Sequence, residues 1–116
     1  MDVDDSSVQI TNELGPFQSM WRAWDEVDRE LKAKPLGHFE RSIEIQFEEM
    51  REHLAADDRA AAVREAVDVV SIGLNCLRWM GLDPAEVAEA VQSRTDTRMQ
   101  GKTREILDKY QRLFGI

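Results

Sequence analysis

The sequence predicts an all-α protein, a bundle of four to five amphipathic helices that is completed by oligomerisation. Apolar residues recur at intervals of three and four along most of the chain, which is the spacing of one helix face. No segment alternates apolar and polar residues as a half-buried strand would. The composition, with three prolines and six glycines in 116 residues, is globular and favours helix. This length predicts one domain over residues 1–116.

The first helix is expected over residues 16–33. Residues 1–12 before it are polar, and we expect them to form a loose segment. Pro16 suits the first turn of a helix, where its missing N–H has no partner to lose. The apolar residues that follow lie on one stripe, which we assign to the core: Phe17, Met20, Trp24, Val27 and Leu31.

Two longer helices follow. Pro35 and Gly37 interrupt the first stripe, and a second helix is expected over residues 38–55. A third helix follows the polar turn at 56–60 and ends near Gly81, whose residue type favours a C-cap. The second helix carries the stripe Phe39, Ile43, Phe47, Met50 and Leu54, and the third carries Val63, Val67, Val70, Leu74 and Leu77.

The fourth helix begins with a capping-box signature. Asp83 is the expected N-cap, Pro84 the first helical residue, and Glu86 the residue that returns a hydrogen bond to the cap. This helix is expected to run to about residue 99. After Gly101, a last short helix is indicated by Ile106, Leu107, Tyr110 and Leu113.

Charge argues against general nucleic-acid binding, which needs a basic surface to neutralise phosphates. The net charge is −8, with 20 acids and 9 bases in residues 1–91 and 6 bases and 3 acids in residues 92–116. The acidic body could hold cations, and the basic tail could meet phosphate.

The sequence indicates a cytoplasmic protein. Cys76 is the only cysteine, so no intrachain disulfide can form, and its apolar neighbours suggest a buried thiol in a reducing compartment. The acidic start lacks the regions of a secretory signal. The most apolar stretch, residues 69–77, is far shorter than the ~20 residues of a membrane span, so no membrane partner is expected.

Carboxylates on the second and third helices form the candidate site. Glutamates at 40, 44, 48 and 52 repel one another at a cost of roughly 0.2–0.5 kcal/mol for each pair. Glu49 and Glu52 project from one side of the second helix, and Glu65 and Asp68 stand three apart on the third. In an antiparallel hairpin the two acid pairs can face each other, and oxygen ligands suit Mg²⁺ or Mn²⁺. The alternative is a solvated acidic face with an Arg64–Asp68 salt bridge.

These residues resemble a MazG-type protein of the all-α nucleoside triphosphate pyrophosphohydrolase superfamily, whose signature is ExxE followed by ExxD. The matches are residues 49–52 and 65–68, then Asn75 seven positions beyond Asp68, and the turn at 81–86. Residues 92–98 are similar to the family segment NxKFxxR. They depart from it at Gln92, Arg94 and Thr95, which replace asparagine, lysine and an aromatic residue. The resemblance covers about residues 39–98, and the tail at 98–104 is similar to that of small stand-alone and phage-type relatives.

The resemblance implies a MazG fold and the cleavage of a nucleoside triphosphate to its monophosphate and pyrophosphate. It implies Mg²⁺ or Mn²⁺ held by Glu49, Glu52, Glu65 and Asp68. Glu48 is then a candidate extra ligand or general base, and Glu49 is placed with it as a catalytic candidate. Asn75 could contact sugar or base, and Arg94, Arg98 and Lys102 could contact phosphates. The superfamily includes enzymes for dUTP, dCTP and other nucleotides, so dUTP or dCTP and purine deoxynucleotides both stay open.

Three alternatives stand beside this interpretation. A non-catalytic helical module that dimerises through its apolar stripes is the strongest, although it leaves the facing acid pairs unexplained. A ferritin-like di-iron site needs two ExxH pairs, and neither His38 nor His53 has a glutamate three residues before it. Cys76 lacks an evident histidine partner for nucleophilic catalysis. We assign Trp21 and Trp24 to the core or a dimer interface, and we expect a homodimer or homotetramer.

Overall fold

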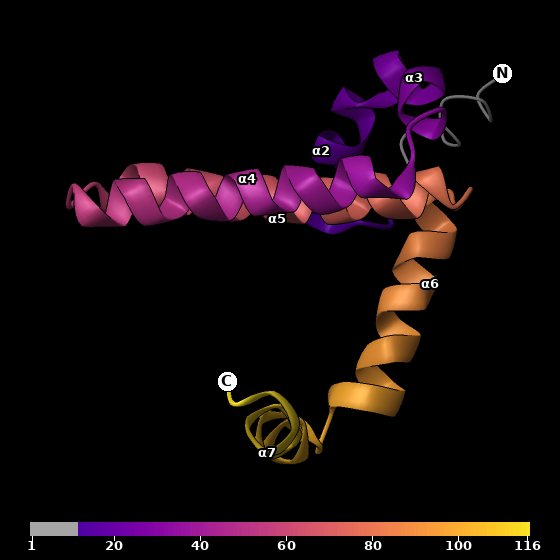
Figure 1. Cartoon of the computed structure of the whole chain (residues 1–116). Coiled ribbons are helices and arrows are strands. Elements are labelled where there is room, and N and C mark those ends of the chain that lie inside the picture. The colour runs from indigo at the N-terminus through magenta and orange to yellow at the C-terminus, as the bar shows by residue number, and fades with distance from the viewer. Residues whose placement is uncertain (1–11) are drawn as a thin grey trace, which may run out of the picture.

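The computed structural model describes residues 12–116, and every regular element in this range is helical, which confirms the all-α class. The expectation of a loose segment at 1–12 falls, except for its last residue, outside the described range. Figure 1 shows two long helices side by side, a short helical segment on one side of them and an arm that leaves at one end. The helices are α2 (Gln18–Ala23), α3 (Asp28–Lys32), α4 (Leu36–Ala55), α5 (Arg59–Trp79), α6 (Pro84–Arg94) and α7 (Thr103–Phe114).

Helices α4 and α5 form the antiparallel hairpin that the sequence predicts (Figure 1). The chain reverses at Asp57, whose φ of 58° is left-handed and suits an aspartate better than most residues. Asp58 then caps α5, because its side-chain oxygen accepts a hydrogen bond from the Ala61 N–H at 3.1 Å. The short turn between the two helices therefore fixes which faces of α4 and α5 meet.

The prediction of one continuous helix over 16–33 is wrong. The segment consists of α2 and α3 with 3₁₀ turns at Gly15–Phe17 and Asp25–Val27. The second turn falls where long-range contacts pull the chain towards α5. Trp24 Nε1 donates to Ser71 Oγ at 2.9 Å, and Arg78 Nη1 donates to Asp25 and Asp28, each at 2.9 Å. These contacts satisfy polar groups that a straight helix would leave apart.

Arg78 is the centre of this connection. Its side chain is only 4% exposed, and its guanidinium lies 4.3 Å from the centroid of the Trp21 ring. Arg78 Nη2 also donates to the Trp21 carbonyl oxygen. A buried guanidinium needs such partners, because an unpaired buried charge is costly. The short N-terminal helices are thus held on α5 by one arginine.

Few side chains are buried in a single chain. Within residues 12–116 the buried apolar residues are Trp21, Leu31, Phe39, Ala61, Ala62 and Val87. The stripe assigned to the core at 17–31 is only partly buried, because Phe17 and Trp24 are 44% and 37% exposed. Half of the ten residues in the two longer stripes are also exposed: Phe47, Leu54, Val63, Val67 and Val70. The stripes are present at the predicted positions, but one chain does not cover them.

The C-terminal arm begins at the predicted capping box. The Asp83 carboxylate accepts from the Glu86 N–H at 2.9 Å, and the Glu86 carboxylate accepts from the Asp83 N–H at 3.0 Å. Val87, fully buried, anchors the first turn of α6. The helix ends at Arg94 rather than near 99, and a π-helical turn, Thr95–Met99, follows. None of the described helices is both long and apolar enough to cross a membrane.

Replacing Arg78 with methionine should lower the free energy of unfolding by about 2–3 kcal/mol. This is below the ~3–5 kcal/mol of a fully buried pair, because the Asp25 side chain is 60% exposed. Urea unfolding followed by circular dichroism measures the change, with Arg29→Met as a control at an exposed arginine of α3. An unchanged midpoint in Arg78→Met would show that the clamp does not hold the segment.

Candidate functional site

Polar side chains line the seam where α4 meets α5. On α4 they are Ser42, Gln46, Glu49 and His53, which recur at intervals of three and four and so share one face. On α5 they are Glu65, Asp68, Ser71 and Asn75. Polar groups between two helices need partners, water or a ligand, because burial strips them of their solvent. The seam is therefore the natural place to look for a site.

Two carboxyl groups meet across this seam. The Glu65 side chain, which is 15% exposed, faces the exposed Glu49 carboxyl across the seam. Hydrogen bonding to Glu49, then burial, and then the negative charges of Glu49 and Asp68 raise the pKa of Glu65 above its ordinary value of 4.5. His53 Nε2 lies 3.9 Å from Glu65 Oε1 and partly opposes that rise. The seam thus places Glu65 near two other predicted metal ligands, Glu49 and Asp68.

Glu52 and Glu48 occupy different surroundings. Glu52 is exposed one turn beyond Glu49, and helical spacing places it on the same side of α4. Glu48 accepts a hydrogen bond from Arg41 Nη1 at 2.9 Å, and Arg41 also contacts Glu44 at 3.3 Å. These two carboxylates raise the pKa of Arg41. Glu48 is therefore engaged along its own helix rather than across the seam.

The carboxylates are neighbours without forming a ready-made cage. Within residues 12–116, no three acidic, histidine or cysteine side chains converge closely enough to hold an ion as they stand. The chemistry of the donor set nevertheless fits a hard divalent cation, because carboxylate oxygens are its preferred ligands. Two carboxyls that share a hydrogen bond in a partly enclosed seam are also the arrangement that added positive charge would relieve. Arg64 does not provide that charge, since no ion pair joins it to Asp68.

A cavity of about 560 Å³ adjoins the acids. Asp68 lines it, and Asn75, seven residues further along α5, lines it about two helical turns away. Cavities of this size bind small organic ligands in other proteins. Its remaining walls come from α3, α4, α5 and the turn before α3: Trp24, Val27, Glu30, Leu31, Lys34, His38, Phe39, Ser42, Gln46, Ser71 and Ile72.

Two amide side chains line this cavity, and the oxygen of one, Gln46, is buried without a partner. Asn75 is 5% exposed and forms no hydrogen bond to any described residue. Gln46 Oε1 is buried and also has no partner. A buried amide without a hydrogen bond costs about 1–3 kcal/mol, so such groups are normally satisfied by water or ligand. An amide offers both a donor and an acceptor, as the edge of a nucleobase does.

The predicted phosphate-contacting residues lie on the arm. Arg94 and Lys102 are exposed and Arg98 is half-buried, and Lys102 Nζ donates to the Thr97 carbonyl at 3.2 Å. Figure 1 shows the arm running away from the hairpin that carries the acids. Among the described residues, no lysine or arginine forms an ion pair with any of the four predicted ligands. One chain does not bring these cations to the carboxylates.

Sequence reasoning missed Gln46 and placed Trp24 in the core or an interface, although both line the cavity. The signal for Gln46 was available. Ser42 and Gln46 continue the line of Glu49 and His53 along one face of α4, and a polar line facing another helix marks a site. For Trp24 no sequence signal exists, because its hydrogen bond to Ser71 joins residues 47 positions apart.

Comparisons of the chain with models of known protein families, with curated proteins and with solved structures found no match. The residues and their geometry therefore carry the functional argument.

Without divalent metal, thermal stability should fall as the pH rises from the ordinary pKa of glutamate through the raised pKa of Glu65. The folded state binds this proton more tightly than the unfolded state, so folding is favoured at low pH and loses that advantage once Glu65 ionises. Melting temperatures measured across this range in Glu65→Gln should show a flatter dependence. Glu40→Gln, at an exposed glutamate of the same hairpin, is the control. Matching profiles in Glu65→Gln and the unaltered chain would contradict the shift.

Proposed function

We propose that this protein is a metal-dependent nucleoside triphosphate pyrophosphohydrolase, which converts a nucleoside triphosphate and water to the monophosphate and pyrophosphate. The observation that supports it most is the row formed by the Glu49, Glu65 and Asp68 carboxylates and the cavity that Asp68 shares with Asn75. A nucleotide has the matching two parts, a polyphosphate that needs cations and a base that fits a mainly apolar pocket with a few polar groups.

The acids of the seam would bind metal, and the amides of the cavity would bind the sugar or base. Glu49, Glu52, Glu65 and Asp68 would hold Mg²⁺ or Mn²⁺, which when bound neutralises phosphate charge and lowers the pKa of a coordinated water. Glu49 and Glu65 would release their shared hydrogen bond to act as ligands. Asn75 and Gln46 would hydrogen-bond sugar or base inside the cavity. Glu48 would first have to leave Arg41 to serve as a base.

The second candidate is a non-catalytic helical interaction module. The exposed apolar stripes of α4, α5 and α7 favour it, because they offer large surfaces for another helix. It provides no role for the acid seam or for the unpartnered amides, and the two candidates differ in whether nucleotides are turned over.

A panel of ribo- and deoxynucleoside triphosphates with Mg²⁺ should show turnover of at least one member to monophosphate and pyrophosphate. Glu52→Gln and Asp68→Asn should each lower the rate on the order of 100-fold or more, the size of losing one stabiliser of transition-state charge. Melting temperature should be maintained in both variants, because Glu52 and Asp68 are exposed. Full activity in both variants would show that the proposed ligands are wrong.

Gln46→Leu and Asn75→Leu should weaken nucleotide binding by about tenfold each, the effect of roughly 1.4 kcal/mol. The leucines keep the side-chain bulk and remove the hydrogen-bonding groups that the ligand would satisfy. Fluorescence of Trp24, measured in a chain in which Trp21 and Trp79 are replaced by phenylalanine, reports binding on titration with a nucleoside monophosphate, with Gln111→Ala on α7 as the control. Unchanged affinity in both leucine variants would place the base elsewhere.

A further inference from the structure

One side-chain hydrogen bond holds Trp24 in the wall of the cavity. Trp24 belongs to the N-terminal segment at 18–34, which carries α2 and α3. Its indole Nε1 donates to Ser71 Oγ at 2.9 Å, and among residues 12–116 this bond is the one polar contact of the indole. Trp24 is also 37% exposed, so protein does not enclose it on every side. The ring is therefore a part of the wall that can turn.

The Ser71 hydroxyl lies between the two ends of the cavity. Asp68 precedes Ser71 by three residues and Asn75 follows it by four, and all three line the cavity from the same face of α5. The bonded indole of Trp24 therefore stands between the acid end, where Asp68 lies, and the amide end, where Asn75 lies. A ligand that reaches from one end to the other has to pass the Trp24 ring.

The backbone on both sides of Trp24 is fixed more firmly than its side chain. Arg78 donates to the Trp21 carbonyl oxygen before it and to the Asp25 and Asp28 carboxylates after it. Hydrogen bonds from a guanidinium are charge-assisted and roughly twice as strong as neutral ones. Arg78 is also buried, whereas the bond of the indole is only partly buried. The cavity wall is thus most easily opened at the Trp24 side chain.

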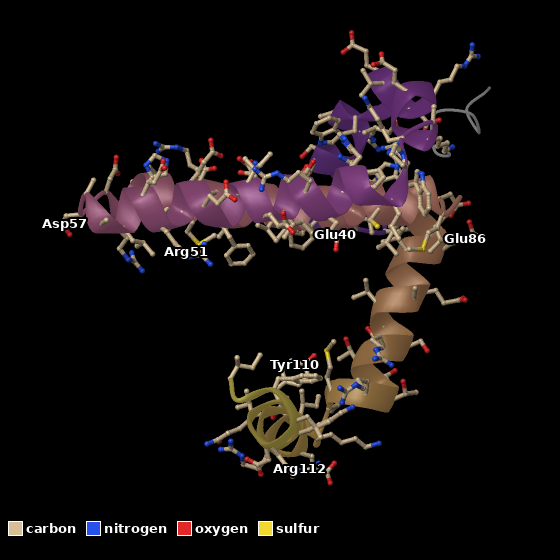
Figure 2. The ribbon with its side chains drawn as sticks, viewed as in Figure 1. Glu40, Arg51, Asp57, Glu86, Tyr110 and Arg112 are labelled. Atoms are coloured by element: carbon tan, nitrogen blue, oxygen red, sulfur yellow. The ribbon has the colours of Figure 1, made fainter. Side chains whose placement is uncertain are left out.

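The C-terminal end of the same segment has an anchor of its own. Trp79 Nε1 donates to the Lys34 carbonyl oxygen at 2.7 Å. Figure 2 shows the segment on the half of the hairpin where Glu40 lies, so it rests on the part of α4 that lines the cavity. With anchors at Arg78 and Trp79, the segment can keep its place while the Trp24 ring turns.

We propose that the Trp24 side chain is a gate of the cavity, latched by the Ser71 hydroxyl and carried by a backbone that Arg78 holds in place. The ring leaves Ser71, turns outwards and admits a ligand between Asp68 and Asn75. One neutral hydrogen bond shifts such an equilibrium by roughly fivefold, so the latch favours the closed gate and still allows frequent opening. That the admitted ligand is a nucleotide rests on the proposed function, whereas the gate itself does not.

Hydrogen exchange of the Trp24 and Trp79 indole protons, followed by NMR on the full chain, tests the latch without a ligand. Ser71→Ala should speed exchange of the Trp24 proton about fivefold, the factor set by the lost bond. Ser71→Thr keeps a hydroxyl and should restore the slow rate. The Trp79 proton should exchange equally in all three proteins, because its bond to Lys34 reports whether the segment itself has moved.

Ser42→Ala is the matched control for the loss of a hydroxyl from the cavity wall. Its hydroxyl donates to the His38 carbonyl oxygen rather than meeting Trp24, so the Trp24 proton should exchange as in the unaltered chain. Equal exchange of this proton in Ser71→Ala and the unaltered chain would overturn the latch. Faster exchange of the Trp24 and Trp79 protons together would also overturn the gate, because the whole segment would then lift.

Titration with a nucleoside monophosphate and Mg²⁺ tests whether the gate controls entry. Line shapes of the Trp24 indole NMR signal give the association rate, and a ligand enters only the open fraction, so Ser71→Ala should raise this rate about threefold to fivefold. An unchanged association rate in a variant whose indole proton exchanges faster would overturn the gate. No binding of any nucleotide, with the faster exchange present, would instead reject the proposed function and leave the gate standing.

Discussion

Two acidic side chains, Glu49 and Glu65, face each other between α4 and α5, and this polar seam constrains the rest of the structure. Polar groups occupy the seam between the two longest helices, so this contact cannot act as an ordinary apolar core. Small residues, Ala61 and Ala62, provide much of the buried apolar surface of α5. The hairpin gains its remaining support from the N-terminal segment held by Arg78. The contact between α4 and α5 therefore contains polar side chains, while half of the apolar residues in the two stripes stay exposed.

Local signals explain which parts of the fold could be predicted from the sequence. The caps at Asp58 and Asp83 act within three residues, and both helices begin where those residues predict. The break near Asp25 could not be predicted, because its cause is an arginine about fifty positions away. Periodicity located the stripes of α4 and α5 but not the direction they face. A stripe that packs against another chain has the same spacing as one that packs within its own.

The candidate site also has a part that local spacing predicts and a part that depends on contacts between distant segments. Spacing on each helix, together with the short turn, was enough to predict that Glu49 would meet Glu65 and that Asp68 would lie close by. Glu48 was only a candidate extra ligand or base in the sequence, and in the structure it pairs with Arg41, seven residues earlier on the same helix. The cavity depends on the kink that brings Trp24 over Ser71, so its lining could not be read from helical spacing. The acids were predictable because they are local, and the pocket was not because it is assembled from distant segments.

The negative charge of the chain bears directly on the proposed chemistry. Residues 1–91 carry a net charge of −11, and a triphosphate approaching them would meet repulsion before it reached the cavity. His53 is the one basic side chain within 4 Å of the four acids in the described part of the chain. Metal held at the seam would reverse the local sign. A chain free of metal should therefore be a poor nucleotide binder even with its cavity fully formed.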